Sequence, residues 1–229
     1  MKTNLAPSLL ALTLTASLLP AAARAQLIIS EVDPTGSSAS YGADWFELKN
    51  IGASAVDITG WKMDDSSASF GSAVALRGLT SIAPGLSVIF LEGNATGTTD
   101  ATIDANFISA WFGGSAPVGL TLANYGGAGV GLSASGDAVN IYNGAGVLQA
   151  GITFGTSTTG ISFDNAAGLS GTISQLSVAG VNGAFVSFNG LETGSPGDVT
   201  PAPEPSSLGL IGLGLTGLFG LRRRQSRPA

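Results

Sequence analysis

Two glutamates near the start of the chain are the residues with the clearest potential for chemistry. Glu31 and Glu47 lie in two short segments of alternating apolar and polar residues, which predict strands that could be neighbours. A glycosidase needs two carboxyl groups about 5–9.5 Å apart, so a carbohydrate-active hydrolase using this pair is one hypothesis. We favour a structural interpretation, with both side chains on the solvent face or paired with a lysine, because no cleft-forming insertion accompanies them.

Other residue types used for catalysis are scarce. The sequence contains no His and no Cys, which removes the commonest general base, thiol nucleophiles, thiolate metal sites and disulfides. A serine–lysine arrangement would need Lys49 or Lys62, and both lie in alternating segments where we expect the side chain to face solvent. We therefore expect neither enzymatic activity nor a cofactor.

Acidic residues at the borders of the same segments form a second candidate set. Asp33, Asp44, Asp64 and Asp65 could supply the hard oxygen ligands that Ca²⁺ prefers, which makes a calcium-dependent adhesion domain an alternative function. The sequence lacks the DxDxDG run of a calcium-binding loop. We therefore favour a solvated acidic rim over a bound ion.

The three tryptophans could form a platform for sugars. Trp45 and Trp61 lie in or beside predicted strands, where a large ring normally packs in the core. Trp111 belongs to Asp104–Phe112, whose apolar residues have helical spacing and whose first residue is the expected cap. We expect a short helix there and consider Trp111 the best candidate for an exposed aromatic residue.

The segments that hold these residues are typical of an all-β fold. Alternation over residues 28–33 and 45–50 predicts two strands, separated by a loop rich in Gly, Ser and Pro. Farther along, residues 137–142 and 147–154 predict a hairpin, with Asn143-Gly144 as its turn because both residue types tolerate positive φ. We expect the chain to form packed β-sheets.

These segments resemble the lamin tail domain. The opening pattern, E-V-(loop)-D-W-x-E-L-x-N-x-G-x-x-x-x-D-I-x-G-W, is carried by Glu31, Val32, Asp44, Trp45, Glu47, Leu48, Asn50, Gly52, Asp57, Ile58, Gly60 and Trp61. Two later blocks also match: I-A-P-G-x-x-x-x-F-L from Ile82, and L-x-x-x-G-D-x-V-x-I-Y-x-x-x-G from Leu132. The resemblance implies an all-β, immunoglobulin-like β-sandwich over residues 26–198, and it leaves the function open.

The first 25 residues are typical of a secretory signal peptide. A basic start at Lys2 and an apolar run over Leu9–Leu19 precede small residues at Ala23 and Ala25, so we expect cleavage before Gln26. The apolar run is short for a membrane span, which makes a permanent N-terminal anchor the less favoured alternative. Secretion machinery and a signal peptidase are the expected partners.

The other end of the chain has three parts. A Pro-rich linker covers residues 199–207, an apolar run covers 208–221, and a basic tail covers 222–229. Fourteen helical residues extend about 21 Å, less than the ~30 Å hydrocarbon core, so we expect a short transmembrane helix that spans a thinned bilayer. Arg222, Arg223 and Arg224 would stay on the cytoplasmic side.

This tail resembles the PEP-CTERM sorting signal of Gram-negative bacteria. The matching parts occur in order and are Pro203-Glu204-Pro205, the apolar run and Arg222-Arg223-Arg224. The resemblance implies cleavage by an exosortase near the PEP triplet, and a host that makes exopolysaccharide. A plain single-span anchor with a basic stop is the alternative.

The net charge of the predicted domain and linker excludes one class of partner. Residues 26–205 contain only three basic residues, Lys49, Lys62 and Arg77, against fifteen acidic ones, so their net charge is 3 − 15 = −12. Such a body repels phosphate backbones, and we expect no nucleic-acid partner. We predict a non-enzymatic, exported module of the cell surface or extracellular matrix. It would be anchored transiently in the inner membrane, and would be structural or bind exopolysaccharide or other envelope components.

Overall fold

The computed structural model describes residues 27–198 of the 229-residue chain. The expected signal peptide at 1–25 and cleavage residues Ala23, Ala25 and Gln26 lie outside the described residues. So do the linker at 199–207, the short transmembrane helix at 208–221 and the basic tail at 222–229. Among the helices of the described part, none is long and apolar enough to cross a membrane.

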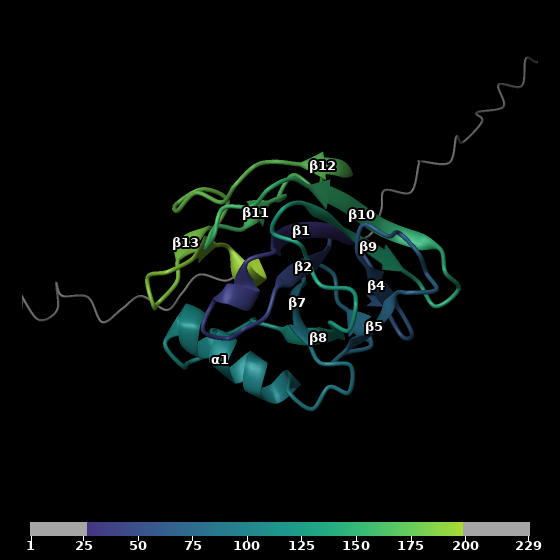
Figure 1. Cartoon of the computed structure of the whole chain (residues 1–229), viewed down its shortest axis with the longest axis horizontal. Helices are drawn as coiled ribbons and strands as arrows, with labels where there is room; N and C mark the ends of the chain where they lie inside the picture. The colour runs from purple at the N-terminus through teal and green to yellow at the C-terminus, as the bar shows by residue number, and fades with distance from the viewer. Residues whose placement is uncertain (1–26, 199–229) are drawn as a thin grey trace, which may run out of the picture.

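Ten strands form one mixed sheet that folds over on itself, and Figure 1 shows its strands surrounding a common interior. Their order is β11-β1-β2-β7-β8-β5-β4-β9-β10-β12. The bounds are β1 Leu27–Asp33, β2 Trp45–Asn50, β4 Lys62–Asp64, β5 Val74–Arg77, β7 Ser87–Gly93, β8 Leu122–Gly126, β9 Asp137–Tyr142, β10 Leu148–Phe154, β11 Phe163–Asp164 and β12 Gly171–Ile173.

The remaining elements are short. Two small sheets pair β3 (Val56–Asp57) with β6 (Ser81–Ile82) and β13 (Phe185–Val186) with β14 (Thr193–Gly194). The helices are η1 (Gly36–Ser38), α1 (Asp100–Phe112) and η2 (Pro196–Asp198). Because strands dominate and enclose the main core, the predicted all-β, immunoglobulin-like sandwich is confirmed.

The sheet becomes two layers at β5, which pairs with β8 on one side and with β4 on the other. The main core fills the space between the layers and includes Phe46, Phe90 and Tyr125, whose rings lie 5.3 Å apart in two pairs. Trp61 belongs to the same core, as expected. Burial of apolar rings between the layers supplies the main stabilisation of the fold.

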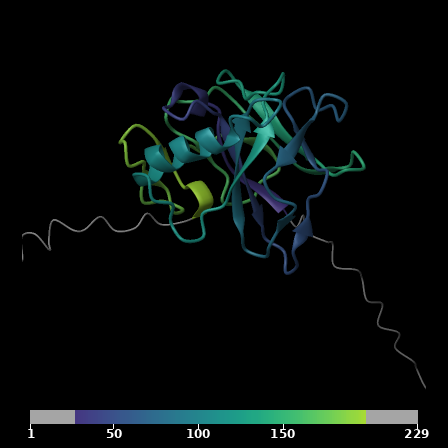
Figure 2. The same ribbon diagram turned by 90° about the horizontal axis from the view of Figure 1, so that it is seen from below.

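A second, smaller core lies between the sheet and α1, which runs along the outer side of β7 and β8 (Figures 1 and 2). Trp45 and Trp111 meet there edge to face, with ring centroids 6.1 Å apart. The expectation that Trp111 is exposed is therefore wrong, because its exposed fraction is only 1%. The apolar side of α1 is buried against the outward-facing residues of β2 and β7.

The helix and the hairpin differ in detail from the sequence-based expectations. Helix α1 begins at Asp100, one turn before the expected cap Asp104, whose carboxylate instead accepts a hydrogen bond from Asn124 at 2.9 Å. In the β9–β10 hairpin the positive φ falls on Gly146 and not on Asn143-Gly144. The side chain of Asn143 accepts bonds from two backbone amides farther along the loop, and this stabilises a longer turn.

Candidate functional site

The structure brings Glu31 and Glu47 together. They are register partners on the antiparallel strands β1 and β2, so their side chains leave the same face of the sheet. A β-bulge between Ile29 and Glu31 shifts the alternation of β1, with Ile29 and Val32 in the main core and Glu31 on the opposite side. The exposed fractions of Glu31 and Glu47 are 1% and 2%, so the expected solvent-facing position is wrong for both.

The end of the described chain covers this pair, and we call residues 193–198 the closing segment. Ser195 donates to Glu31 twice, from its backbone amide to Oε1 at 2.8 Å and from its hydroxyl to Oε2 at 3.0 Å. The amide of Gly197 donates to Oε2 of Glu47 at 2.5 Å. A Cβ on Gly194 would lie 2.6 Å from Oε1 of Glu31, so only glycine permits this close approach.

Serine hydroxyls complete the environment of the pair. Ser30 donates to Oε1 of Glu47 at 2.6 Å, and Ser162 donates to Oε1 of Glu31. Ser162 is in turn bonded to Ser177 at 2.7 Å. Every carboxylate oxygen of the pair thus accepts at least one hydrogen bond from the chain itself.

Burial dominates the acid–base behaviour of the pair. It raises the pKa of Glu31 to about 8, and the neighbouring charge of Glu47 adds to the effect, whereas the bonds from Ser162 and Ser195 oppose it. Burial also raises the pKa of Glu47. Two neighbouring carboxyl groups that are buried from water do not readily ionise together. One proton therefore remains on the pair near neutral pH.

A second set of carboxylates lies at one end of three neighbouring strands. Asp33 ends β1, Asp44 immediately precedes β2, and Glu92 is the next-to-last residue of β7. The registers place Asp33 opposite Trp45 and Trp45 opposite Leu91. The three acids therefore lie at the same end of these neighbouring strands. Glu192, near the end of the described residues, joins Asp33 there; burial raises the pKa of Glu192, and the charge of Asp33 adds to this effect.

These four acids are not a solvated rim. Asp33, Asp44 and Glu192 are buried, and Glu92 is half-buried. Asp33 accepts two bonds from Thr35, and Glu192 accepts one at 2.5 Å from the hydroxyl of Tyr41. The interpretation of Asp33 and Asp44 as solvated is therefore wrong, because the loop between β1 and β2 folds over this end of the strands.

The pKa of each acid in this set is raised, first by burial. It reaches about 7 for Glu92, where Asp44 contributes, and about 7 for Glu192. It is also raised for Asp33 and Asp44. None of the three basic residues in the described chain bonds to these acids, because Lys49 pairs with Asp198, Arg77 pairs with Asp100, and Lys62 lies over Phe70.

The other two calcium candidates lie at the end of a different strand, β4, and the interpretation of Asp64 as solvated is also wrong, because this side chain is buried. Asp64 ends β4 and accepts bonds from Ser67, Ser69 and Ser72 of the loop that follows it. Asp65 accepts a bond from the amide of Ser67. The structure therefore places Asp33 and Asp44 near each other but keeps Asp64 and Asp65 within their own loop. Within residues 27–198, no three acidic side chains are placed to hold a metal ion together.

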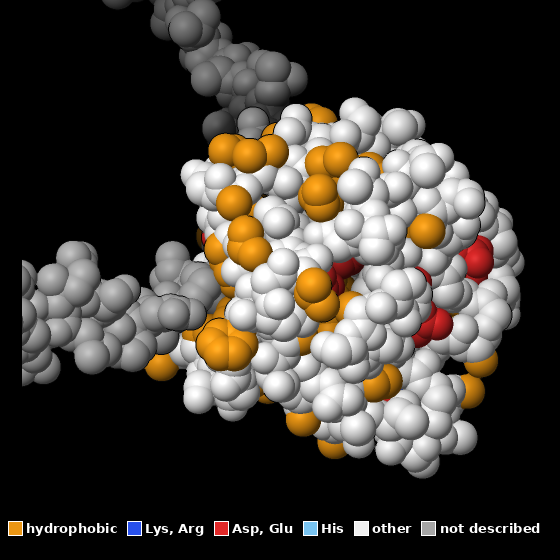
Figure 3. Space-filling model, turned by 60° about the vertical axis from the view of Figure 1, so that its left-hand side comes forward, with side chains coloured by type: hydrophobic (Ala, Val, Ile, Leu, Met, Phe, Trp, Pro, Cys, Tyr) orange, Lys and Arg blue, Asp and Glu red, His pale blue; other side chains and the backbone are white. Residues whose placement is uncertain are grey.

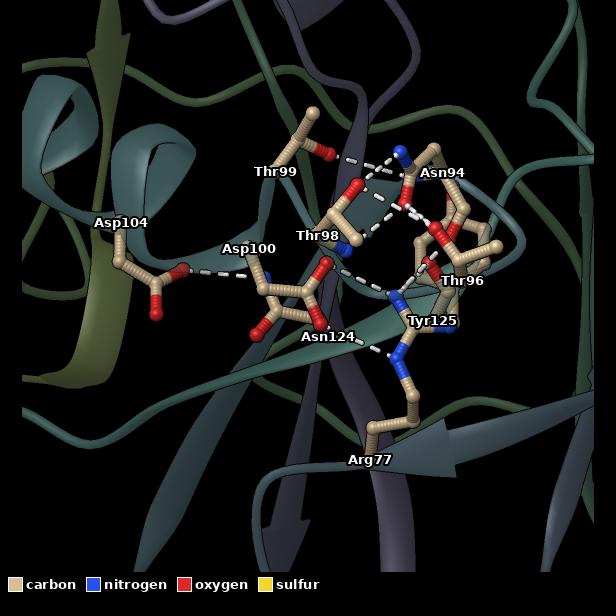
Figure 4. A network of polar contacts seen from close by, with 9 residues as sticks. All are labelled: Arg77, Asn94, Thr96, Thr98, Thr99, Asp100, Asp104, Asn124 and Tyr125. Atoms are coloured by element: carbon tan, nitrogen blue, oxygen red, sulfur yellow. Dashed lines mark hydrogen bonds and ion pairs between the residues drawn. The ribbon is translucent and has the colours of Figure 1, made fainter.

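The half-buried Glu92 borders a hollow of about 460 Å³ that we call the Glu92 pocket. Its other principal lining residues are Asn94, Thr98, Thr99, Thr102 and Ile103. Figure 4 shows the polar network beside it, where Arg77 donates to both carboxylate oxygens of Asp100 and Asn94 bonds to Thr98. The sequence analysis did not identify this pocket. The signal present was an acidic residue at the end of a buried apolar strand.

Figure 3 shows another face of the molecule, with apolar side chains on its surface and acidic atoms at the base of a hollow. Much of the exposed apolar area in the described chain comes from one stretch near its end. Its members are about half to three-quarters exposed and are Val178, Val181, Val186, Phe188 and Leu191. These residues lie within β13 or near it in the sequence, and the closing segment follows them.

Comparison with known families agrees with this architecture. A family model described as Lamin Tail Domain matches residues 20–156, more than half of the chain. The chain belongs to the lamin tail domain family. The match spans β1 to β10, so Glu31 and Glu47 lie inside the lamin tail region, while Ser162, Ser195 and Gly197 lie beyond it. The closing segment is thus outside the part that defines the family.

A second family model, the PEP-CTERM protein-sorting motif, matches residues 201–224. That range contains the triplet Pro203-Glu204-Pro205 and the basic run Arg222-Arg223-Arg224, as the sequence analysis expected. This lamin tail domain protein therefore carries a signal for export and exosortase sorting to the cell surface or exterior of a Gram-negative bacterium. No curated protein matches the chain.

Proposed function

We propose that this protein is a non-enzymatic module of the cell surface or extracellular matrix that binds exopolysaccharide or other envelope components. The observation that supports this most is the use of Glu31 and Glu47 as attachment points for the closing segment. The chain's best-placed pair of carboxylates therefore serves to hold the end of the domain.

Hydrolysis by this pair would need room for a sugar and a water molecule between or beside the carboxylates. Both side chains are almost fully buried, and their oxygens are occupied by amides and hydroxyls of the same chain. A substrate could reach them only after residues 193–198 had left the sheet. We therefore propose a structural role for the pair and no catalytic residue.

The position of the closing segment also supports sorting of an intact domain. It ends at Asp198, only a few residues before the PEP-CTERM match begins at residue 201. An enzyme that cleaves near Pro203-Glu204-Pro205 would act beyond residues 193–198, the last hydrogen-bonded residues of the described part of the chain, and would leave the fold closed.

We further propose how the N-terminal and C-terminal segments of the chain are processed. Signal peptidase removes residues 1–25 before Gln26, and the run at 208–221 anchors the protein transiently in the inner membrane with residues 222–229 in the cytoplasm. Exosortase then cleaves within the linker at 199–207, and the domain reaches the surface or the medium.

The test is to express the full chain in a bacterium with and without its exosortase and to fractionate the envelope. We expect a shortened protein at the surface or outside when exosortase is present, and a longer species in the inner membrane when it is absent. Glu204→Gln should reduce processing, whereas Asp57→Asn, on an exposed part of the domain, should not. An unprocessed inner-membrane species in both strains would refute the proposal.

A separate experiment tests whether exopolysaccharide is a binding partner. The exported protein should co-sediment with the exopolysaccharide isolated from the same host. Recovery of all the protein in the supernatant, at every polymer concentration, would remove exopolysaccharide from the proposal and leave the sorting unaffected.

A further inference from the structure

We propose that Asn94 is a site of N-linked glycosylation, at which an oligosaccharide is attached to the side-chain amide nitrogen during export. Asn94 opens the tripeptide Asn94-Ala95-Thr96, which has the N-x-[ST] pattern of a glycan acceptor. Of the ten asparagines in the chain, only this one has a Ser or Thr two positions later. The inference rests on the proposed function for export alone, because the chain must meet a glycan donor outside the cytoplasm.

The acceptor tripeptide lies in the loop that joins β7 to α1, and all three of its residues are exposed. β7 ends at Gly93 and α1 begins at Asp100, so Asn94 is the first residue of the loop. The tripeptide contributes no side chain to either hydrophobic core. An oligosaccharide on Asn94 would therefore extend into solvent without disturbing the packing of the domain.

The side-chain amide of Asn94 has a hydrogen free for substitution. Its nitrogen carries two hydrogens, and within the described chain it donates one bond, to the hydroxyl of Thr98 at 2.8 Å. Its oxygen accepts from the hydroxyl of Thr96 at 3.2 Å and from the amide of Thr98 at 3.1 Å (Figure 4). Replacing the second hydrogen by a sugar leaves all three bonds in place, so the folded loop can carry the modified side chain.

The surface around Asn94 has room for the first sugar unit. Asn94 is itself one of the residues that line the hollow of about 460 Å³, together with Thr98, Thr99 and Ile103. Threonine hydroxyls can form hydrogen bonds with a sugar, and the apolar side chain of Ile103 can pack against the C–H groups of its ring. The loop is also held from below, since Arg77 donates to the backbone oxygen of Asn94 at 3.2 Å.

The transfer is a substitution on a lipid-diphosphate-linked oligosaccharide, catalysed by an oligosaccharyltransferase of the host. A C–N bond forms between the anomeric carbon of the sugar and Nδ2 of Asn94, while the bond from that carbon to the diphosphate oxygen breaks. The diphosphate leaves with the bonding electron pair, and the amide nitrogen loses one proton to a base of the transferase. The step needs no oxidant or reductant. This chain supplies only the acceptor, which agrees with a non-enzymatic role.

The test is mass spectrometry of the protein recovered from the surface or medium of its own host. Cleavage after Glu92 and before Asp100 releases residues 93–99, which contain the whole acceptor. We expect this peptide to be heavier than its sequence by the mass of an oligosaccharide, and fragmentation to place the glycan on Asn94. Asn94→Gln and Thr96→Val should both abolish the added mass.

Two variants are matched controls that should keep the glycan. Thr98→Val changes a neighbouring exposed threonine outside the tripeptide, and Asn106→Gln changes an exposed asparagine that lacks the pattern. Melting temperatures show that each variant is folded.

An unmodified peptide 93–99 from exported protein would overturn the assignment and leave export and sorting intact. Added mass that persists in Asn94→Gln would also overturn it, because the sugar would then lie on a threonine. A protein that is never exported would refute the proposed function and this site together.

Discussion

Glu31 and Glu47 face each other across β1 and β2 and hold consecutive parts of one segment, Ser195 and Gly197, more than 140 positions later in the chain. The two ends of the domain are thereby joined by buried hydrogen bonds. Since the sorting motif follows directly, the attachment lies between the folded domain and the part of the chain that is processed.

Glu31→Gln should flatten the pH dependence of stability. The folded state keeps a proton on Glu31 up to a pKa of about 8, whereas the unfolded chain loses it near 4.5. Between these values the folded state binds more protons, so the free energy of unfolding decreases as pH rises from about 5 to 8. The melting temperature of the unaltered protein should fall over this range.

The fall should be smaller in Glu31→Gln and unchanged in Asp57→Asn. Asp57 is a suitable control because its pKa is lowered by bonds from Thr59, so it titrates below this range. Thermal unfolding monitored by circular dichroism measures all three proteins. Equal slopes in the unaltered protein and Glu31→Gln would show that Glu31 is ionised in the folded state.

Ser195→Ala should loosen the closing segment. It removes the hydroxyl bond to Oε2 of Glu31 but keeps the backbone bond to Oε1, and we expect a loss of about 1–2 kcal/mol in the free energy of unfolding. Urea denaturation measures this loss, with Ser115→Ala as an exposed control that should change stability by less than about 0.5 kcal/mol. If the two variants are equally stable, the attachment contributes nothing to the fold.

Asp100→Asn should release the wall of the Glu92 pocket. Arg77 and Asp100 are each less than a quarter exposed and form a two-bond pair, so its loss should cost about 1–2 kcal/mol. Amide hydrogen exchange should increase over residues 93–101 and remain unchanged in β9. Unaltered exchange near residue 94 would contradict the role of this pair in ordering the loop.

Tryptophan fluorescence checks the packing of α1. Trp45, Trp61 and Trp111 are all the tryptophans of the chain, and each is at most 8% exposed. The emission should be that of buried indoles, and iodide should quench it only weakly. Strong quenching that disappears in Trp111→Phe would show that Trp111 is exposed after all.

The sequence predicted the strands well because alternation and turn residues are local signals. The strand expected at 45–50 is β2 with the same bounds, and the one expected at 28–33 is β1, which begins one residue earlier at Leu27. The same pattern correctly placed Glu31 and Glu47 on strands that are neighbours. It failed on their exposure, since alternation assigns residues to a face but does not show whether distant chain covers that face.

The errors in exposure at Glu31 and Trp111 have the same physical cause. Glu31 is covered by Ser162 and Ser195, more than 130 positions away, and Trp111 is covered by Trp45 and Phe185. The Glu92 pocket could not be predicted either, because its residues gather through the β7–α1 loop geometry and not through a sequence motif. By contrast, the sorting motif is contiguous and could be recognised directly.

The intact mass of the protein recovered from the cell surface or medium tests the central claim most directly. Exosortase sorting predicts a chain that begins at Gln26 and ends near Pro203-Glu204-Pro205, without Arg222, Arg223 and Arg224. A mass that includes residues 208–229, in cells that contain active exosortase, would contradict the proposed release of the domain from its anchor.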